Sequence, residues 1–142
     1  MRLVLSIVLL VIACTFTPQN ARSEDRNLAV QHALKAADAW LNLIDEGKYR
    51  ESWAESASFF RSKISADDWA KMAAAARNSL GPLISRKFKL AAYASNLPGA
   101  PAGQYVVIEY DASYANNKSV IDKVTPMLDS DGQWRVSGYW IQ

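Results

Sequence analysis

The 142-residue chain contains a single cysteine and a single histidine. Because Cys14 has no partner in the chain, it cannot form an intramolecular disulfide. His32 alone cannot supply a triad or a zinc site, and the sequence has no HExxH, CxxC, G-x-S-x-G or glycine-rich phosphate-binding pattern. These absences exclude the common zinc, serine-hydrolase and nucleotide sites. We therefore predict no metal and no cofactor, and we interpret His32 as a residue at the boundary of the core.

The chain also lacks an excess of charge of one sign. It has 16 basic and 14 acidic residues, but Arg2 and Arg22 precede the expected start of the folded domain, which leaves 14 of each. A neutral domain has no electrostatic footprint for nucleic acid. We therefore predict that no nucleic acid is bound.

The N-terminus resembles a secretory signal peptide. Arg2 precedes an apolar run over residues 3–13 that only Ser6 interrupts, and such a run after a positive charge is typical of export signals. The run is shorter than the ~20 residues that cross a bilayer. We therefore predict a signal peptide at residues 1–23 and a single domain at residues 24–142.

Two processing routes are open for this signal. Cleavage after Ala21-Arg22-Ser23 would start the mature chain at Glu24 and place it in the periplasm or outside the cell. Alternatively, Val11-Ile12-Ala13-Cys14 resembles the lipoprotein box, in which case a lipid on Cys14 would anchor the protein to the membrane.

Three helices are predicted in the first half, where apolar residues recur at steps of three and four. They cover residues 27–47, 48–60 and 65–80, and the third begins at a capping serine, Ser65, and stops at Gly81. Their apolar stripes are Val30, Ala33, Ala37, Trp40 and Ile44; Tyr49, Trp53, Ala57 and Phe60; and Trp69, Met72, Ala73 and Ala76.

Four strands are predicted in the second half, at residues 86–94, 104–114, 119–129 and 134–140, because the pattern changes to a period of two. Pro126 cannot donate to a ladder and is expected at an edge or a bulge, and Asp131-Gly132 is typical of a hairpin turn. The expected core-facing residues are Phe88, Leu90, Ala92 and Ala94; Val106, Ile108, Tyr110, Ala112 and Tyr114; and Trp134, Val136, Gly138 and Trp140. This order predicts an α+β domain in which three N-terminal helices pack on one face of a four-stranded antiparallel sheet.

Four blocks of sequence carry a resemblance to a known family. They are AADAWLNLIDEGKYRESWAESASFFR, SADDWAKMAAAARNSLGPLISRKF, LPGAPAGQYVVIEYDASYANNKS and DGQWRVSGYWI. In this order they are similar to exported bacterial proteins grouped as domain of unknown function 4019. The resemblance implies a curved, cone-shaped sheet of the cystatin-like and nuclear-transport-factor-like kind, with helices closing its wide end. It implies no activity.

The same fold type suggests where chemistry could occur. A carboxylate inside a cone can have a raised pKa, and a tyrosine can stabilise an enolate. The strand pattern offers Asp122, Tyr110 and Tyr114 as catalytic candidates for a cofactor-independent isomerase or hydrolase. Glu109 and Asp111, in contrast, are expected in a solvated ladder of opposite charges with the side chains of Lys87, Lys89, Lys123 and Arg135.

The tryptophans are expected either to fill the core or to line a pocket. They are Trp40, Trp53, Trp69, Trp134 and Trp140. Gly138, which lies between bulky residues, is expected to admit a neighbouring ring or to mark a bulge.

The leading interpretation is an exported, non-catalytic binding or accessory module of the bacterial envelope. Its partner would be a small apolar ligand or an envelope protein, bound at the mouth of the cone, at the SNLPGAPAG loop (residues 95–103) or on an exposed sheet face. A homodimer through the sheet is also open, with Tyr93, Tyr105, Val107, Tyr139 and Ile141 on the face away from the core.

Overall fold

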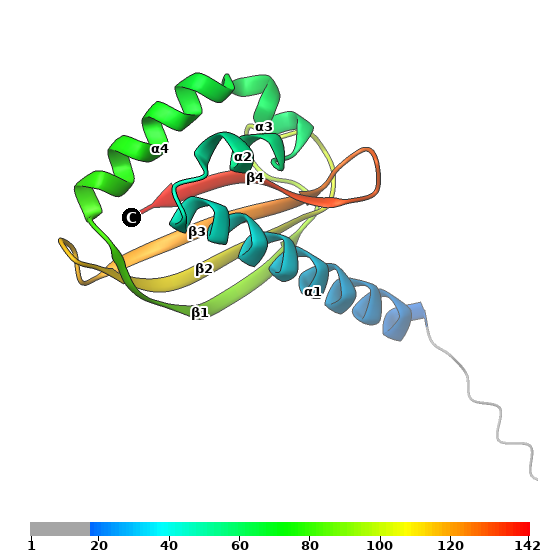
Figure 1. Ribbon diagram of the computed structural model, residues 1–142. Helices are drawn as coiled ribbons and strands as arrows, with labels where there is room; N and C mark the ends of the chain where they lie inside the picture. The colour runs from blue at the N-terminus through cyan, green and yellow to red at the C-terminus, as the bar shows by residue number, and fades with distance from the viewer. Residues whose placement is uncertain (1–17) are drawn as a thin grey trace, which may run out of the picture.

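The computed structural model describes residues 18–142, with side chains from residue 22 onward. These residues form the helices α1 (Pro18–Asp45), α2 (Tyr49–Ala54), α3 (Ser58–Lys63) and α4 (Ala66–Leu80). The strands are β1 (Leu83–Ala94), β2 (Tyr105–Tyr114), β3 (Val120–Leu128) and β4 (Trp134–Ile141). They form one antiparallel sheet in the order β1-β2-β3-β4, and the helices lie on one face of this curved sheet (Figure 1). The predicted α+β class is confirmed.

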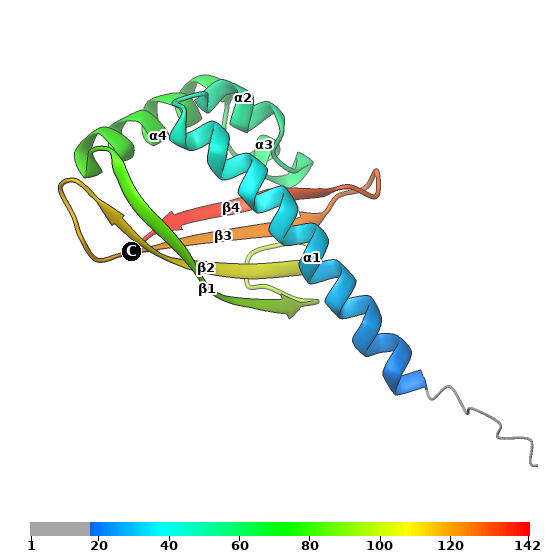
Figure 2. The same cartoon turned by 60° about the horizontal axis from the view of Figure 1, so that its bottom comes forward.

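Helix α1 crosses the sheet and buries the stripe that the sequence predicts. Ala33, Ala37, Trp40 and Ile44 are all buried in the main core. The N-terminal part of α1 extends beyond the sheet (Figures 1 and 2), and residues 22–28 are exposed. The predicted cleavage point after Ser23 falls within this exposed part, while Cys14 and the apolar run lie outside the described residues.

The second predicted helix is two helices, so residues 18–142 contain four helices where three were expected. The break lies at Ala57, whose backbone N–H donates to the Val136 carbonyl of β4 at 2.8 Å. The Asp129 carboxylate also accepts hydrogen bonds from the backbone N–H and the hydroxyl of Ser58. These bonds to the sheet replace helical hydrogen bonds and start α3 as a separate turn.

Helix α4 has the predicted ends but a different buried stripe. Ser65 accepts a hydrogen bond from the Asp68 N–H at 3.1 Å, and Gly81 ends the helix with a φ of 74° that favours glycine. The buried residues are Trp69, Ala73 and Arg77. The prediction for Met72 and Ala76 was wrong, because both are exposed.

Two register shifts change which residues of β1 and β4 face the core. On β1 a shift between Phe88 and Leu90 puts Ala91 and Tyr93 against the core and leaves Leu90 and Ala92 exposed. The expectation of one continuous apolar face on β1 was therefore wrong, because a one-residue bulge exchanges the two faces of a strand.

The second shift lies opposite Pro126, between β3 and β4. Trp134 and Val136 face the core as expected, but beyond the shift it is Tyr139 that packs against the core, while Trp140 is 52% exposed. The placement of Trp140 on the core face was wrong. Pro126 itself marks the bulge that its missing N–H predicted, although it lies on an inner strand of the sheet and not on an edge.

Candidate functional site

A tryptophan cluster fills the space between the helices and β4. The indole rings of Trp40 and Trp69 lie 5.8 Å apart, and both residues are buried. The Trp40 indole N–H donates to the Ser52 carbonyl at 2.8 Å and to the Ser56 hydroxyl at 2.9 Å, and the Trp69 N–H donates to the Ser52 hydroxyl at 3.0 Å. Each buried indole N–H of this pair is thus satisfied. The cluster is a structural core and offers no polar group to a ligand.

A polar cluster lies nearby, where the C-terminal ends of α1 and α4 meet the sheet. We call the side chains of Asp45, Arg77, Arg86, Tyr114, Asp122 and Tyr139 the polar cluster. Arg86 donates from Nε to Asp122 Oδ2 at 2.8 Å and from Nη1 to Asp45 Oδ2 at 2.7 Å. Arg77 donates to Asp45 Oδ1 at 2.8 Å. The two arginines and two aspartates balance in charge, which reduces the cost of burying them.

Burial and opposite charges act against each other on these groups. Burial by itself lowers the pKa of Arg86, but the hydrogen bonds and charges of Asp45 and Asp122 outweigh it and raise that pKa. Burial raises the pKa of Asp45, whereas the hydrogen bonds from Arg86 and Arg77 lower it by more. Both arginines therefore stay protonated and Asp45 stays ionised near neutral pH.

Three buried atoms of the polar cluster have no hydrogen-bond partner among the described residues. They are Arg77 Nη1, Asp122 Oδ1 and the Tyr139 hydroxyl oxygen. A buried polar group without a partner costs about 1–3 kcal/mol. Unlike the tryptophan cluster, the polar cluster therefore has unused donors and acceptors that a ligand could pair with.

The structure brings together two of the three catalytic candidates. Asp122 is fully buried, and its Oδ2 accepts a hydrogen bond from the Tyr114 hydroxyl at 2.7 Å. Tyr110 stands opposite Asp122 on the neighbouring strand, but its hydroxyl donates to Asp38 at 2.8 Å. The sequence did not indicate the ion pair with Arg86, which fixes Asp122 as a charged partner.

Arg77 and Tyr139 were missed by the sequence analysis. Arg77 lies on the same helical stripe as Trp69 and Ala73, at a step of four from Ala73, and this spacing was its one signal. Tyr139 was placed on the outer face because the alternation of β4 was continued through Gly138, although the register shift lies next to this glycine.

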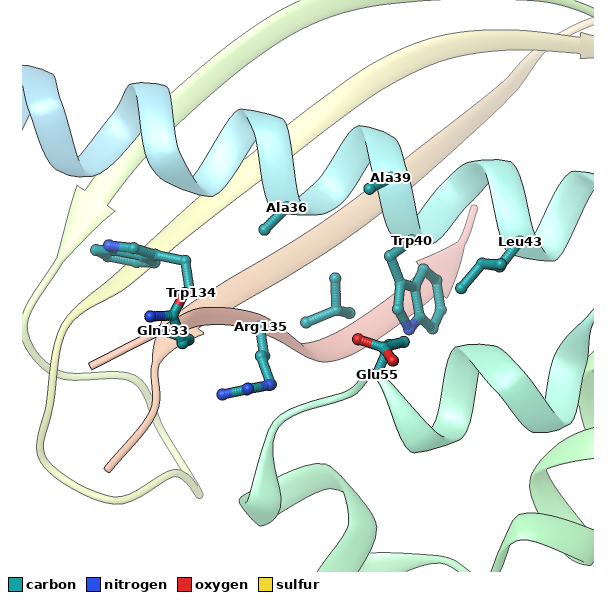
Figure 3. A pocket seen from close by; sticks show the side chains of 9 residues that line it. Ala36, Ala39, Trp40, Leu43, Glu55, Gln133, Trp134 and Arg135 are labelled. Atoms are coloured by element: carbon teal, nitrogen blue, oxygen red, sulfur yellow. The ribbon is translucent and has the colours of Figure 1, made fainter. Parts of the chain in front are cut away.

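A shallow cleft of about 210 Å³ lies between α1 and β4. Figure 3 shows Trp40 and Trp134 near its two ends, with Glu55 and Arg135 at its rim. Arg135 is bound to Asp131 at 2.6 Å, so the positive charge at the rim of this cleft is already paired. His32, which is exposed, borders a neighbouring hollow with Trp134.

A wider groove of about 450 Å³ is lined by residues of β2, β3 and β4, by the loop that follows β1 and by Phe59 of α3. We call it the outer groove. It is lined by Phe59, Leu97, Pro98, Gly99, Ala100, Tyr105, Val107, Lys123, Thr125, Ser137, Trp140 and Gln142. It therefore combines the SNLPGAPAG loop with the exposed ring of Trp140, two features that lie far apart in the sequence.

Gly138 determines how Trp140 lies in this groove. A Cβ added at Gly138 would lie 2.3 Å from Cη2 of the Trp140 ring, closer than two non-bonded carbon atoms can approach. The ring therefore lies across the glycine, as the sequence predicted for a neighbouring ring. Glycine at this position fixes an indole on the outer surface.

Another part of the outer face carries charged residues. Lys123 Nζ lies 3.1 Å from Glu109, and Lys89 lies 3.7 Å from Asp111, which confirms this part of the predicted ladder. Arg135 does not join it, since it pairs with Asp131 and Asp129.

Several residues that were expected on an apolar, dimer-forming outer face are instead packed within the protein. Tyr93 and Tyr139 pack against the main core, and Tyr105 is buried beneath the 95–103 loop with Met127. Ile141 packs against a smaller cluster around Ala112 and Tyr114. Val107 remains on the outer face, as a wall of the outer groove.

The described part of the chain contains neither a candidate metal site nor a candidate membrane-spanning helix. Within residues 18–142, no three side chains of histidine, cysteine, aspartate or glutamate gather as a metal site would require. In the same part of the chain, no helix combines the length and the apolar character needed to cross a bilayer.

The fold and its hollows define a small α+β domain with several candidate binding surfaces, and those described above are bordered by the edge strand β4. The model of the family described as "Protein of unknown function (DUF4019)" matches residues 36–139, and the chain belongs to this family. No curated protein and no solved structure matches the chain.

Proposed function

We propose that the protein is an exported, non-catalytic binding module of the bacterial envelope, which holds a segment of another envelope protein in the outer groove. The observation that carries this proposal is the exposed Trp140 ring, held across Gly138 beside the 95–103 loop. A large exposed indole beside an apolar hollow is the kind of surface that marks an interaction site.

The shape of the groove favours a protein segment over a small molecule. Pockets for small molecules enclose most of the ligand surface, whereas this groove is open along β2, β3 and β4. Phe59 and Trp140 supply aromatic contacts, and aromatic residues dominate the energy of protein interfaces. Lys123 and Glu109 lie at the side of the groove and can form its polar rim.

Export is supported by the N-terminal sequence and is compatible with the fold. Cleavage after Ser23 would remove no buried side chain among the described ones, because residues 22–28 are exposed. The intact mass of protein extracted from the cell envelope distinguishes the two routes. A chain that starts at Glu24 without lipid excludes the lipoprotein route, and a diacylglyceryl adduct on Cys14 excludes cleavage after Ser23.

A cofactor-independent isomerase or hydrolase has less support. Asp122 and Tyr114 are hydrogen-bonded, but Asp122 is fully buried and paired with Arg86, and it does not line any of the hollows described above. If a substrate is found, Asp122→Asn should abolish turnover, and full activity in that variant would exclude a catalytic Asp122.

Site-specific photo-crosslinking in cells tests the proposed partner. A photoreactive phenylalanine analogue at Pro98, an exposed groove residue, should give one adduct of discrete mass that mass spectrometry identifies as an envelope protein. Trp140→Ala should reduce the adduct by about 30-fold, the effect of losing ~2 kcal/mol at a hot spot.

Leu90→Ala is the matched control, because Leu90 is an exposed apolar residue of the sheet outside the outer groove. It should leave the adduct unchanged. An adduct that survives Trp140→Ala would contradict the proposal, as would an adduct with a second copy of this chain. A small molecule found in the groove in place of a protein would contradict it as well.

A further inference from the structure

A second hollow, of about 280 Å³, lies between α4 and β4. We call it the α4–β4 hollow. It is lined by Trp69, Met72, Ala73, Ala76, Arg77, Tyr139, Trp140 and Ile141. Its lining is mainly apolar, and a cavity of ~150 Å³ in another protein already accommodates benzene. The α4–β4 hollow therefore has room for a molecule of about one ring.

Two of the three unpartnered atoms belong to residues that line this hollow. Arg77 is 8% exposed and uses Nη2 for Asp45, which leaves the donor Nη1 without a partner among the described residues. The Tyr139 hydroxyl is likewise buried and unpartnered within the described chain. The hollow thus combines apolar walls with two side chains that carry an unpartnered polar atom, a composition like that of a small-molecule site. Because both atoms are closed to solvent, a ligand reaches them only when neighbouring side chains of the wall move aside.

The rest of the polar cluster holds Arg77 in place. Its guanidinium lies over the Tyr114 ring, 4.9 Å from the ring centroid, and is bound to Asp45 at 2.8 Å. Nη1 is therefore a donor in a fixed position. A donor held in place before binding loses less conformational entropy when it binds a ligand.

Charge balance indicates what kind of polar group fits. Asp45 and Asp122 neutralise Arg77 and Arg86 through contacts of 2.7–2.8 Å. An anionic ligand would add a buried charge without a counter-charge, which is unfavourable. A neutral hydroxyl or carbonyl can accept from Arg77 Nη1 and pair with the Tyr139 hydroxyl at no such cost.

We propose that the α4–β4 hollow binds a small, mainly apolar molecule that carries one neutral hydrogen-bonding group, with Arg77 Nη1 and the Tyr139 hydroxyl as its polar partners. Met72 and Trp140, which are 60% and 52% exposed, stand at the entrance. This site is distinct from the outer groove, and Trp140 borders both.

Binding of phenol, toluene and benzoate to the purified protein, measured by ligand-detected NMR and calorimetry, tests the proposal. Phenol and toluene have nearly the same shape, but only phenol has a hydroxyl. One hydrogen bond between neutral groups increases the affinity by roughly two- to tenfold. Phenol should therefore bind more tightly than toluene by that factor. Benzoate should bind more weakly than phenol.

Tyr139→Phe keeps the ring and removes the hydroxyl. It should abolish the preference for phenol over toluene without reducing the affinity for toluene. Because it deletes an unpartnered buried hydroxyl, it should not lower the melting temperature, so a loss of preference cannot be attributed to unfolding.

Ala76→Leu and Ala75→Leu form a matched pair on α4. Both alanines are exposed, but only Ala76 lines the hollow. Leucine at 76 should fill the hollow and abolish binding of both rings, whereas leucine at 75 should change neither. The proposal fails if phenol and toluene bind equally or benzoate binds more tightly than phenol. It also fails if Ala76→Leu retains binding, or if no ring binds and the hollow holds only water.

Discussion

The two interior clusters of this domain differ in how completely their polar atoms are paired. In the tryptophan cluster, the N–H groups of Trp40 and Trp69 find acceptors within α2 and the segment that follows it. In the polar cluster, Arg77, Asp122 and Tyr139 each keep one buried atom without a partner in the described chain. The comparison separates a region built for stability from a region with unused hydrogen-bonding capacity. Unsatisfied buried polar groups are uncommon in folded proteins, so the second region is where we place a ligand.

The largest expected effect comes from removing one member of the polar cluster. Asp122→Ala leaves Arg86 with one carboxylate instead of two and removes the partner of the Tyr114 hydroxyl. Breaking a buried ion pair costs about 3–5 kcal/mol, and urea denaturation should show a loss of that size. Asp111→Ala removes an exposed carboxylate of the neighbouring strand and should change stability by less than about 0.5 kcal/mol. A loss below about 1 kcal/mol for Asp122→Ala would contradict the role of the ion pair.

A smaller loss of stability is expected when the buried Trp40 or the exposed Trp140 is replaced by phenylalanine. Trp40→Phe removes an indole N–H with two acceptors and opens space in the core, and should cost about 2 kcal/mol. Trp140→Phe, at a 52% exposed position, should cost less than about 0.5 kcal/mol. Thermal and urea unfolding of the two variants provide the measurement. Equal losses of stability in the two variants would contradict the placement of Trp40 in the core and Trp140 at the surface.

The smallest effect should appear only in acid. Asp45 has a lowered pKa in the folded chain, because hydrogen bonds from Arg86 and Arg77 outweigh burial. A carboxylate whose pKa is lowered by folding stabilises the fold above its ordinary pKa, and this contribution is lost as the pH falls through the folded value. The free energy of unfolding should therefore decline below about pH 4, and less steeply in Asp45→Asn. A decline in Asp45→Asn as steep as in the unchanged protein would contradict this contribution of Asp45.

Sequence patterns were sufficient for the fold class and for the elements with strong local signals. The stripe from Ala33 to Ile44 is buried as predicted, Ser65 caps α4, and Gly132 occupies a turn with a φ of 81°. Pro126 correctly indicated a bulge. Each of these features depends on a few neighbouring residues, so a single sequence can reveal it.

The faces of β1 and β4 and the polar cluster depend on partners far away in the chain. The bulge opposite Pro126 inverts the end of β4 next to Gly138. Gly138 was compatible with either a bulge or a neighbouring ring, so this residue alone did not determine the inversion. Arg77, which is buried, and Arg86, which is mostly buried, both bind Asp45, which lies 32 and 41 positions earlier in the chain. A helical or strand period cannot express such a pairing. The tryptophans were therefore considered as core or as pocket residues, and the arginines were overlooked.

A crystal structure of the protein soaked with phenol tests the central claim most directly. We expect the ring between α4 and β4, with its oxygen within hydrogen-bonding distance of Arg77 Nη1 and the Tyr139 hydroxyl. A structure in which the α4–β4 hollow contains only water, or in which phenol lies elsewhere, would contradict the claim that this cluster is a binding site.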